Sequence, residues 1–128
     1  MTALPSEGYS GEVPGLVKYL PAATERHETV WTDLWSTPQA CVWAIEPWRR
    51  TAVADLVKWT VRSEADDAPA AVGNIVRQLR DDCGLSTAGL AREGWAITRD
   101  EVAAKADEKS TEAPAAKPAR RLRAVDAQ

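Results

Sequence analysis

Prolines divide the apolar pattern of this chain into short segments, and this restricts its fold more than any other feature. Pro38, Pro47 and Pro69 each stand near the start of a run of apolar residues at helical spacing. Proline fits the first turn of a helix but breaks a helix interior. We therefore expect several short helices, joined by tight turns.

The first of these helices is expected after Thr24, a residue suited to the N-cap position. Its inward face is the stripe Val30, Trp31, Leu34 and Trp35. A short second helix should begin at Pro38, with Thr37 as its cap. A longer third helix is expected from about residue 47 to 63. Its apolar positions cover more than one face, which indicates burial against two neighbours.

A fourth helix should follow Pro69, because Val72, Ile75, Val76 and Leu79 have helical spacing. Gly84 can end it in the left-handed conformation. Ser86 can cap one more short helix that ends near Gly94, with Trp95 and Ile97 packed behind it. The sequence therefore predicts an all-α fold, in which short helices surround a longer helical hairpin.

The 128 residues indicate one domain with tails. Residues 1–23 are rich in Gly and Pro, and predict an irregular arm with a mobile start. Residues 24–98 form the helical domain. Residues 99–128 are rich in Ala, Lys, Glu, Asp and Pro, and no apolar side chain between Val102 and Leu122 is larger than valine. Such a segment buries too little to offset its ordering entropy, so we expect it to be mostly disordered.

The chain has six tryptophans and no phenylalanine. A ligand cage, a base-stacking surface and core packing could each use so much indole. Aromatic residues at helical spacing are core residues more often than ligand cages. A stacking surface needs indoles interleaved with Arg and Lys, and only Trp48-Arg49-Arg50 and Lys58-Trp59 come close. We therefore interpret the tryptophans as core.

The sequence offers no pattern typical of catalysis. His27 is the single histidine, and the two cysteines, Cys41 and Cys83, form no CxxC pair, so no metal site can be assembled at the usual spacing. A Gly-rich phosphate loop is also missing. We expect a protein without enzymatic activity, metal or cofactor. No signal peptide and no membrane-length apolar run are evident, so a cytoplasmic protein with reduced thiols is expected.

Self-association is indicated by size and by the wide apolar face of the third helix. A core built from about residues 16–97 is near the size at which one domain is only marginally stable. A second copy could cover the second apolar face. The predicted oligomer interface consists of valines and one leucine from two helices: Val53, Leu56, Val57, Val61, Val72 and Val76.

Two motifs resemble one known family. The tryptophan motif, "VWTDLWSTPQACVW" at residues 30–43, is similar to a pattern W-x-x-[IL]-W-x-[ST]-P-[MQ]-[AS]-x-x-W in small terminase subunits of tailed phages that infect actinobacteria. The glycine motif, "IVRQLRDDCGLSTAGLAREGWAI" at residues 75–97, resembles the same family's helix ending in [FY]-G-L-[ST], followed by a short helix and W-x-I. Order and spacing agree over about residues 31–97.

The resemblance implies a component of a DNA-packaging motor in the host cytoplasm. Such subunits assemble as homo-oligomeric rings, recognise double-stranded viral DNA and deliver it to the large terminase subunit, which carries the ATPase and nuclease. They have no catalytic site of their own. In many relatives the short helix after the Gly-Leu-[ST] turn is strongly basic, whereas here only Arg92 keeps a positive charge. DNA contact through that helix is therefore doubtful.

Other basic residues become the candidate DNA contacts. They are Arg49 and Arg50 at the start of the third helix, and Lys117, Arg120, Arg121 and Arg123 in the tail. Residues 1–98 hold 13 acidic and 9 basic side chains, so basic groups are scarce in the body of the domain. Phosphate contacts of this kind give affinity without sequence readout. Arg49 and Arg50 could equally be a solvated helix face.

Two other functions remain open. One is a small helical transcriptional regulator that binds an operator as a dimer. The turn residues of a helix-turn-helix are not clearly placed, and no helix combines Arg, Asn and Gln as base reading needs. The other is a structural adaptor of the virion.

Overall fold

The computed structural model describes residues 1–98, which form a mostly helical unit with one small sheet. The helices are α1 (Glu25–Leu34), α2 (Ala40–Ile45), α3 (Arg50–Ser63), α4 (Ala71–Asp82) and α5 (Thr87–Glu93), with 3-10 helices η1 (Leu16–Lys18) and η2 (Pro47–Arg49). Strands β1 (Thr2–Pro5) and β2 (Trp95–Thr98) pair in parallel. The predicted helical character is confirmed, and the sheet corrects the expectation of helices alone. The predicted disorder of 99–128 lies outside the described residues.

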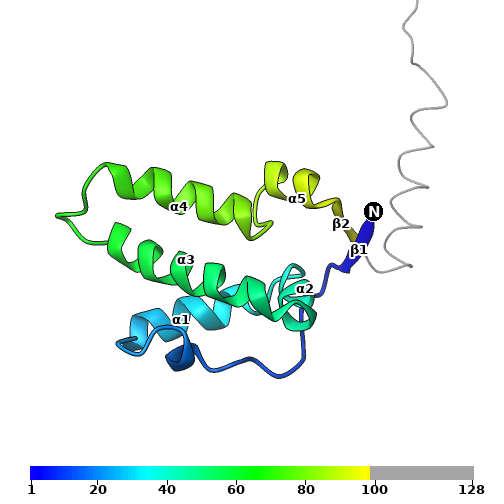
Figure 1. The fold of residues 1–128 in the computed structure, drawn as a ribbon, viewed down its shortest axis with the longest axis horizontal. Coiled ribbons are helices and arrows are strands. Elements are labelled where there is room, and N and C mark those ends of the chain that lie inside the picture. The colour runs from blue at the N-terminus through cyan, green and yellow to red at the C-terminus, as the bar shows by residue number, and fades with distance from the viewer. Residues whose placement is uncertain (99–128) are drawn as a thin grey trace, which may run out of the picture. The chain divides into compact units, whose positions relative to one another are not determined.

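Helix α3 is the centre of the fold and lies between α1 on one side and α4 on the other (Figure 1). Val53, Leu56 and Val57 are fully buried along it. The prediction that this helix is buried against two neighbours is confirmed. Both neighbours come from the same chain, however, so a second copy is not needed to cover its apolar faces.

Local signals set several helix ends where the sequence predicts them. Thr24 caps α1 in a capping box: its backbone N–H donates to Nδ1 of His27 at 2.9 Å. Gly84, with φ of 76°, follows the C-cap of α4, and the Leu85 N–H donates to the Arg80 carbonyl at 2.8 Å. This bond and the one from Gly84 N–H to the Asp81 carbonyl form a Schellman motif.

Helix α5 begins as expected, whereas α2 does not. The Ser86 hydroxyl accepts from the Gly89 N–H at 2.9 Å and so caps α5. Helix α2 begins at Ala40, two residues after Pro38, with Gln39 at its N-cap position. Gln39 is buried, and its Nε2 donates to the Gly84 carbonyl at 2.9 Å. A contact across 45 residues therefore helps to fix the start of α2.

Three tryptophans form the centre of the core. Trp35 packs between Trp31 and Trp43, with ring centroids 5.6 and 5.5 Å away. These three and Trp95 are buried, which confirms the predicted core role for four of the six. The prediction is wrong for Trp48, which is 72% exposed. Trp59 is half-buried.

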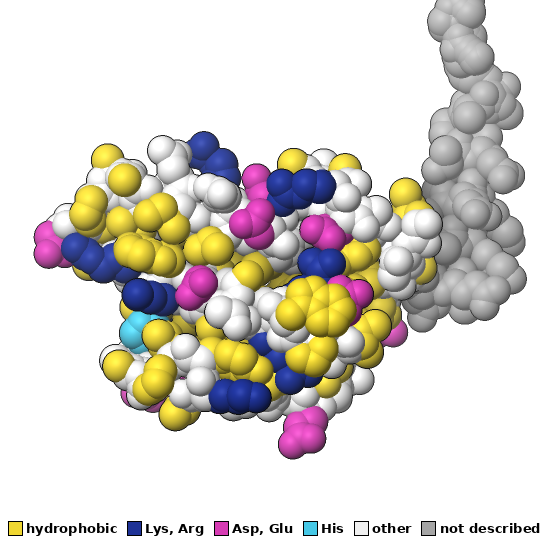
Figure 2. Space-filling view, viewed as in Figure 1, with side chains coloured by type: hydrophobic (Ala, Val, Ile, Leu, Met, Phe, Trp, Pro, Cys, Tyr) yellow, Lys and Arg dark blue, Asp and Glu magenta, His cyan; other side chains and the backbone are white. Residues whose placement is uncertain are grey.

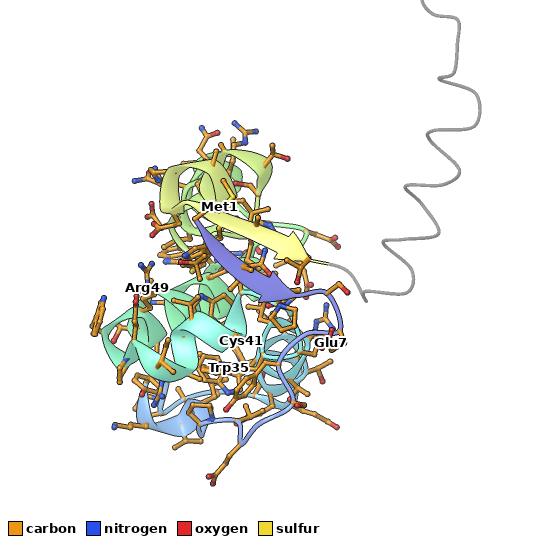
Figure 3. All side chains as sticks on the ribbon, turned by 90° about the vertical axis from the view of Figure 1, so that its right-hand side faces the viewer. Met1, Glu7, Trp35, Cys41 and Arg49 are labelled. Carbon is orange, nitrogen blue, oxygen red and sulfur yellow. The ribbon has the colours of Figure 1, made fainter. Side chains whose placement is uncertain are left out.

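The N-terminal arm is more ordered than the sequence predicts. Strand β1 pairs Thr2 with Trp95 and Leu4 with Ile97, and Figure 3 shows the two strands side by side, with Met1 at the start of β1 and Glu7 just beyond its end. Further along, Leu16 is buried and the Trp31 indole N–H donates to the Pro14 carbonyl at 2.8 Å. The arm packs on the tryptophan core, so it belongs to the domain.

Candidate nucleic-acid interface

Arg49, a predicted DNA contact, is held by other side chains of its own chain. Its guanidinium pairs with Glu46 at 2.5 Å and with Glu93 at 3.0 Å, and lies 5.1 Å from the ring centre of Trp95. Burial acts to lower the pKa of Arg49, but the hydrogen bonds that Arg49 donates to Glu46 and Glu93, together with the negative charges of these two residues, outweigh it and leave the pKa raised. Arg49 thus joins η2 to α5 and β2 (Figure 3).

Arg50, the second predicted DNA contact in the domain, donates hydrogen bonds to backbone carbonyls. Its Nε donates to the Trp43 carbonyl at 3.1 Å and its Nη2 to the Ala44 carbonyl at 2.8 Å. The guanidinium also lies 5.9 Å from the ring centre of Trp35. A DNA phosphate would have to compete with these bonds. Both arginines therefore act as structural residues in this fold.

The side chains predicted to form an oligomer interface are mostly buried in the core of their own chain. Val53, Leu56 and Val57 have no exposed surface, and Val72 is 4% exposed. Val61 and Val76 are half-buried and pack against the same core. The reason is that α1 and α4 cover the two apolar faces of α3. A surface that could meet a second copy has to be found elsewhere.

Arg77 and Arg80 are the basic residues best presented to solvent on the α4 side. Both are exposed and lie three residues apart, on one face of α4. Neither makes an ion pair within residues 1–98. Arg92 of α5 is close in sequence but pairs with Asp82 at 3.1 Å. Figure 2 shows basic side chains along this edge of the molecule.

The sequence also misses a hollow beside α3. It has a volume of about 430 Å³ and is lined by His27, Lys58, Trp59, Val61, Arg62 and Ala65. The ammonium of Lys58 lies 5.3 Å from the ring centre of Trp59, and Arg62 pairs with Asp67 at 3.1 Å. The adjacent Lys58-Trp59 pair is the only sequence signal that could have found this hollow.

A second hollow lies on the other side of Trp59, between α3 and α4. Its volume is about 250 Å³, and its polar lining consists of Asp55, Gln78 and Asp82. Trp59 therefore separates a hollow with basic residues at its edge from one with acidic residues. DNA phosphate is compatible only with the first.

The thiols show no feature that would activate them. Burial raises the pKa of Cys83 to about 12, and burial, followed by the charge of Glu7, raises that of Cys41. Both are therefore protonated at neutral pH. Within residues 1–98, no three His, Cys, Asp or Glu side chains are grouped as metal ligands. No helix in the same residues is long and apolar enough to cross a bilayer.

The four basic tail residues, Lys117, Arg120, Arg121 and Arg123, lie outside the described residues. Their predicted role stays a prediction. Comparison with known proteins adds no assignment, because no family model, curated protein or solved structure matches this chain.

Proposed function

We propose that this chain is a small terminase subunit, which binds double-stranded viral DNA in the host cytoplasm and passes it to the large subunit. The observation that carries the proposal is the contact between the two motifs behind the family resemblance. From the tryptophan motif, Gln39 donates to the Gly84 carbonyl and the Trp43 indole donates to the Cys83 carbonyl at 3.3 Å. The two motifs therefore form one structural unit.

The DNA contact in this proposal comes from α4. Arg77 and Arg80 are exposed and have no carboxylate partner within residues 1–98, unlike Arg49 and Arg92. Two cations per copy are too few for tight binding, since each neutralised phosphate contributes only about 0.9 to the slope of log affinity against log salt. Several copies, arranged in a ring, would present enough of them. The subunit itself performs no chemistry.

One observation favours the alternative of a dimeric regulator. Helices α4 and α5 are joined by a four-residue turn that contains Gly84, as in many helix-turn-helix units. The second helix is poorly suited to base reading, however. Between Thr87 and Glu93 its one long basic side chain is Arg92, and that side chain is paired with Asp82.

The test uses the full chain with the large subunit encoded by the same genome. Wild type should bind duplex DNA and stimulate the DNA-dependent ATPase of the large subunit. Arg77→Ala/Arg80→Ala should lower DNA affinity for all sequences alike and reduce the salt slope by about 2 per copy engaged. Arg26→Ala is the matched control, because Arg26 is exposed but pairs with Glu64 at 2.7 Å. No effect of the wild-type protein on the large subunit would contradict the proposal.

A further inference from the structure

Two large apolar side chains protrude where the chain passes from α2 to α3. Ile45 is 76% exposed and Trp48 is 72% exposed, although four other tryptophans are buried. We refer to this pair as the knob. Pro47 starts η2 between them, and the ion pairs of Arg49 hold the turn in place. Trp48 therefore faces solvent because of a fixed turn, and such exposed apolar groups mark interaction sites.

The hollow beside α3 is a receptor of suitable size for such a knob. Trp59, Val61 and Ala65 supply apolar surface, while Lys58, Arg62 and His27 bring polar groups. Its volume of about 430 Å³ lies in the range of pockets that hold small organic ligands, so one indole fits. We refer to it as the α1–α3 groove, since His27 comes from α1.

The knob cannot enter the groove of its own chain. Trp48 precedes α3, whereas the groove residues lie near the other end of this helix. Ten residues from Trp48 to Lys58 correspond to about 15 Å along a helix axis. Figure 2 shows the single histidine, a groove residue, near the end of the molecule where α3 ends. Only another molecule can fill the groove with an indole from this position.

The chemistry of the two surfaces is complementary. At the knob, two carboxylates, Glu46 and Glu93, share the guanidinium of Arg49. At the groove, Lys58 has no carboxylate partner within residues 1–98 and already lies over an indole ring. An ammonium binds a second indole face in the same way. Two carboxylates on one guanidinium leave a single negative charge beside the knob, which would come near this unpaired cation.

We propose that the knob of one copy of this chain binds in the α1–α3 groove of another copy. Each copy carries one knob and one groove, so each can take part in two contacts and an assembly can close. A single indole buries only about 150–250 Å². One contact is therefore small beside the roughly 1,000 Å² of a stable interface, and we expect weak association that depends on protein concentration. This contact supplies an interface for the assembly that the proposed function calls for, and in that respect it rests on the proposed function, but its test needs neither DNA nor the large subunit.

The test measures the mass of the full chain by sedimentation over a concentration series, without DNA. Wild type should associate, and Trp48→Ala should raise the dissociation constant at least tenfold. Ala65→Arg, which fills the groove from an exposed position, should do the same. Val17→Ala is the matched control, because Val17 is 58% exposed but lies outside both surfaces. Circular dichroism confirms that each variant is folded.

Mixing the two variants gives the sharpest result. The Trp48→Ala chain keeps its groove and the Ala65→Arg chain keeps its knob, so an equimolar mixture should form a one-to-one complex although neither associates alone. A monomeric wild type, an unaffected Trp48→Ala variant, or a mixture that stays monomeric would overturn the proposal. An Ala65→Arg variant that associates as strongly as wild type would overturn it as well, because its groove is filled. A monomer that still stimulates the large subunit would overturn this contact and the ring, while leaving the proposed delivery of DNA to the large subunit intact.

Discussion

Arg50→Ala should destabilise the domain, because the guanidinium completes the end of α2. The last carbonyls of a helix have no partner within it. The residue four positions after Trp43 is Pro47, which has no N–H to donate. Arg50 donates to the Trp43 and Ala44 carbonyls instead, at 3.1 and 2.8 Å. A hydrogen bond to a charged group contributes about 1.5–3 kcal/mol.

The two bonds are only partly buried, so we expect a loss of about 3 kcal/mol, the low end of their sum. Urea unfolding followed by tryptophan fluorescence measures this loss, with an unchanged m-value. Arg50→Lys keeps the charge but cannot reproduce the two-bond fork, and should lose about half as much. Arg77→Ala, at an exposed site on α4, should change stability by less than about 0.5 kcal/mol.

The same variant separates the structural role of Arg50 from its predicted DNA contact. If the guanidinium is held inside the chain, Arg50→Ala binds DNA with an unchanged salt slope under conditions where it is folded. A loss of stability below about 1 kcal/mol, together with a smaller salt slope, would refute the reasoning and return Arg50 to the DNA surface.

Two further predictions test the junction between the motifs. A Cβ on Gly84 would lie 2.1 Å from the Trp95 ring, and the φ of 76° at this position is unfavourable for alanine. Gly84→Ala should therefore lower the free energy of unfolding in urea by about 2–4 kcal/mol. Gly73→Ala, in open space within α4, is the control and should raise it by about 0.5–1 kcal/mol. Burial raises the pKa of Cys83 to about 12, so the folded state holds the thiol proton more tightly than the unfolded state does. The free energy of unfolding should therefore fall by up to about 1.4 kcal/mol per pH unit between pH about 9 and about 12. Cys83→Val should lack this part of the alkaline slope, and an identical slope in both proteins would contradict the prediction.

The features that the sequence predicts well are those fixed by neighbouring residues. The N-cap at Thr24, the end of α3 at Ser63 and the left-handed Gly84 each depend on signals within one turn of the helix. The two-sided burial of α3 follows from its own apolar pattern. These positions needed no knowledge of distant contacts.

The features that the sequence does not predict depend on distant residues. Strand β1 pairs with β2 across about 90 residues, and neither strand has a long alternating pattern. Trp48 matches the apolar pattern, but the change from η2 to α3 alters the helical phase and turns its ring outward. Arg49 has a distant partner in Glu93, whereas Arg50 turns back to the carbonyls of the preceding helix, a bond that apolar periodicity does not reveal.

Charge pairing within the domain connects the two proposals. Of the nine basic residues in 1–98, Arg26, Arg49, Arg62 and Arg92 pair with carboxylates, and Arg50 binds carbonyls. Lys18 and Lys58 lie near aromatic rings, which leaves Arg77 and Arg80 as the cations most available to phosphate. With 13 acidic residues in the same region, a single copy would attract the negatively charged DNA backbone only weakly. Assembly would repeat Arg77 and Arg80, which have no carboxylate partner within residues 1–98, so an interface between copies is what would let this acidic domain hold DNA.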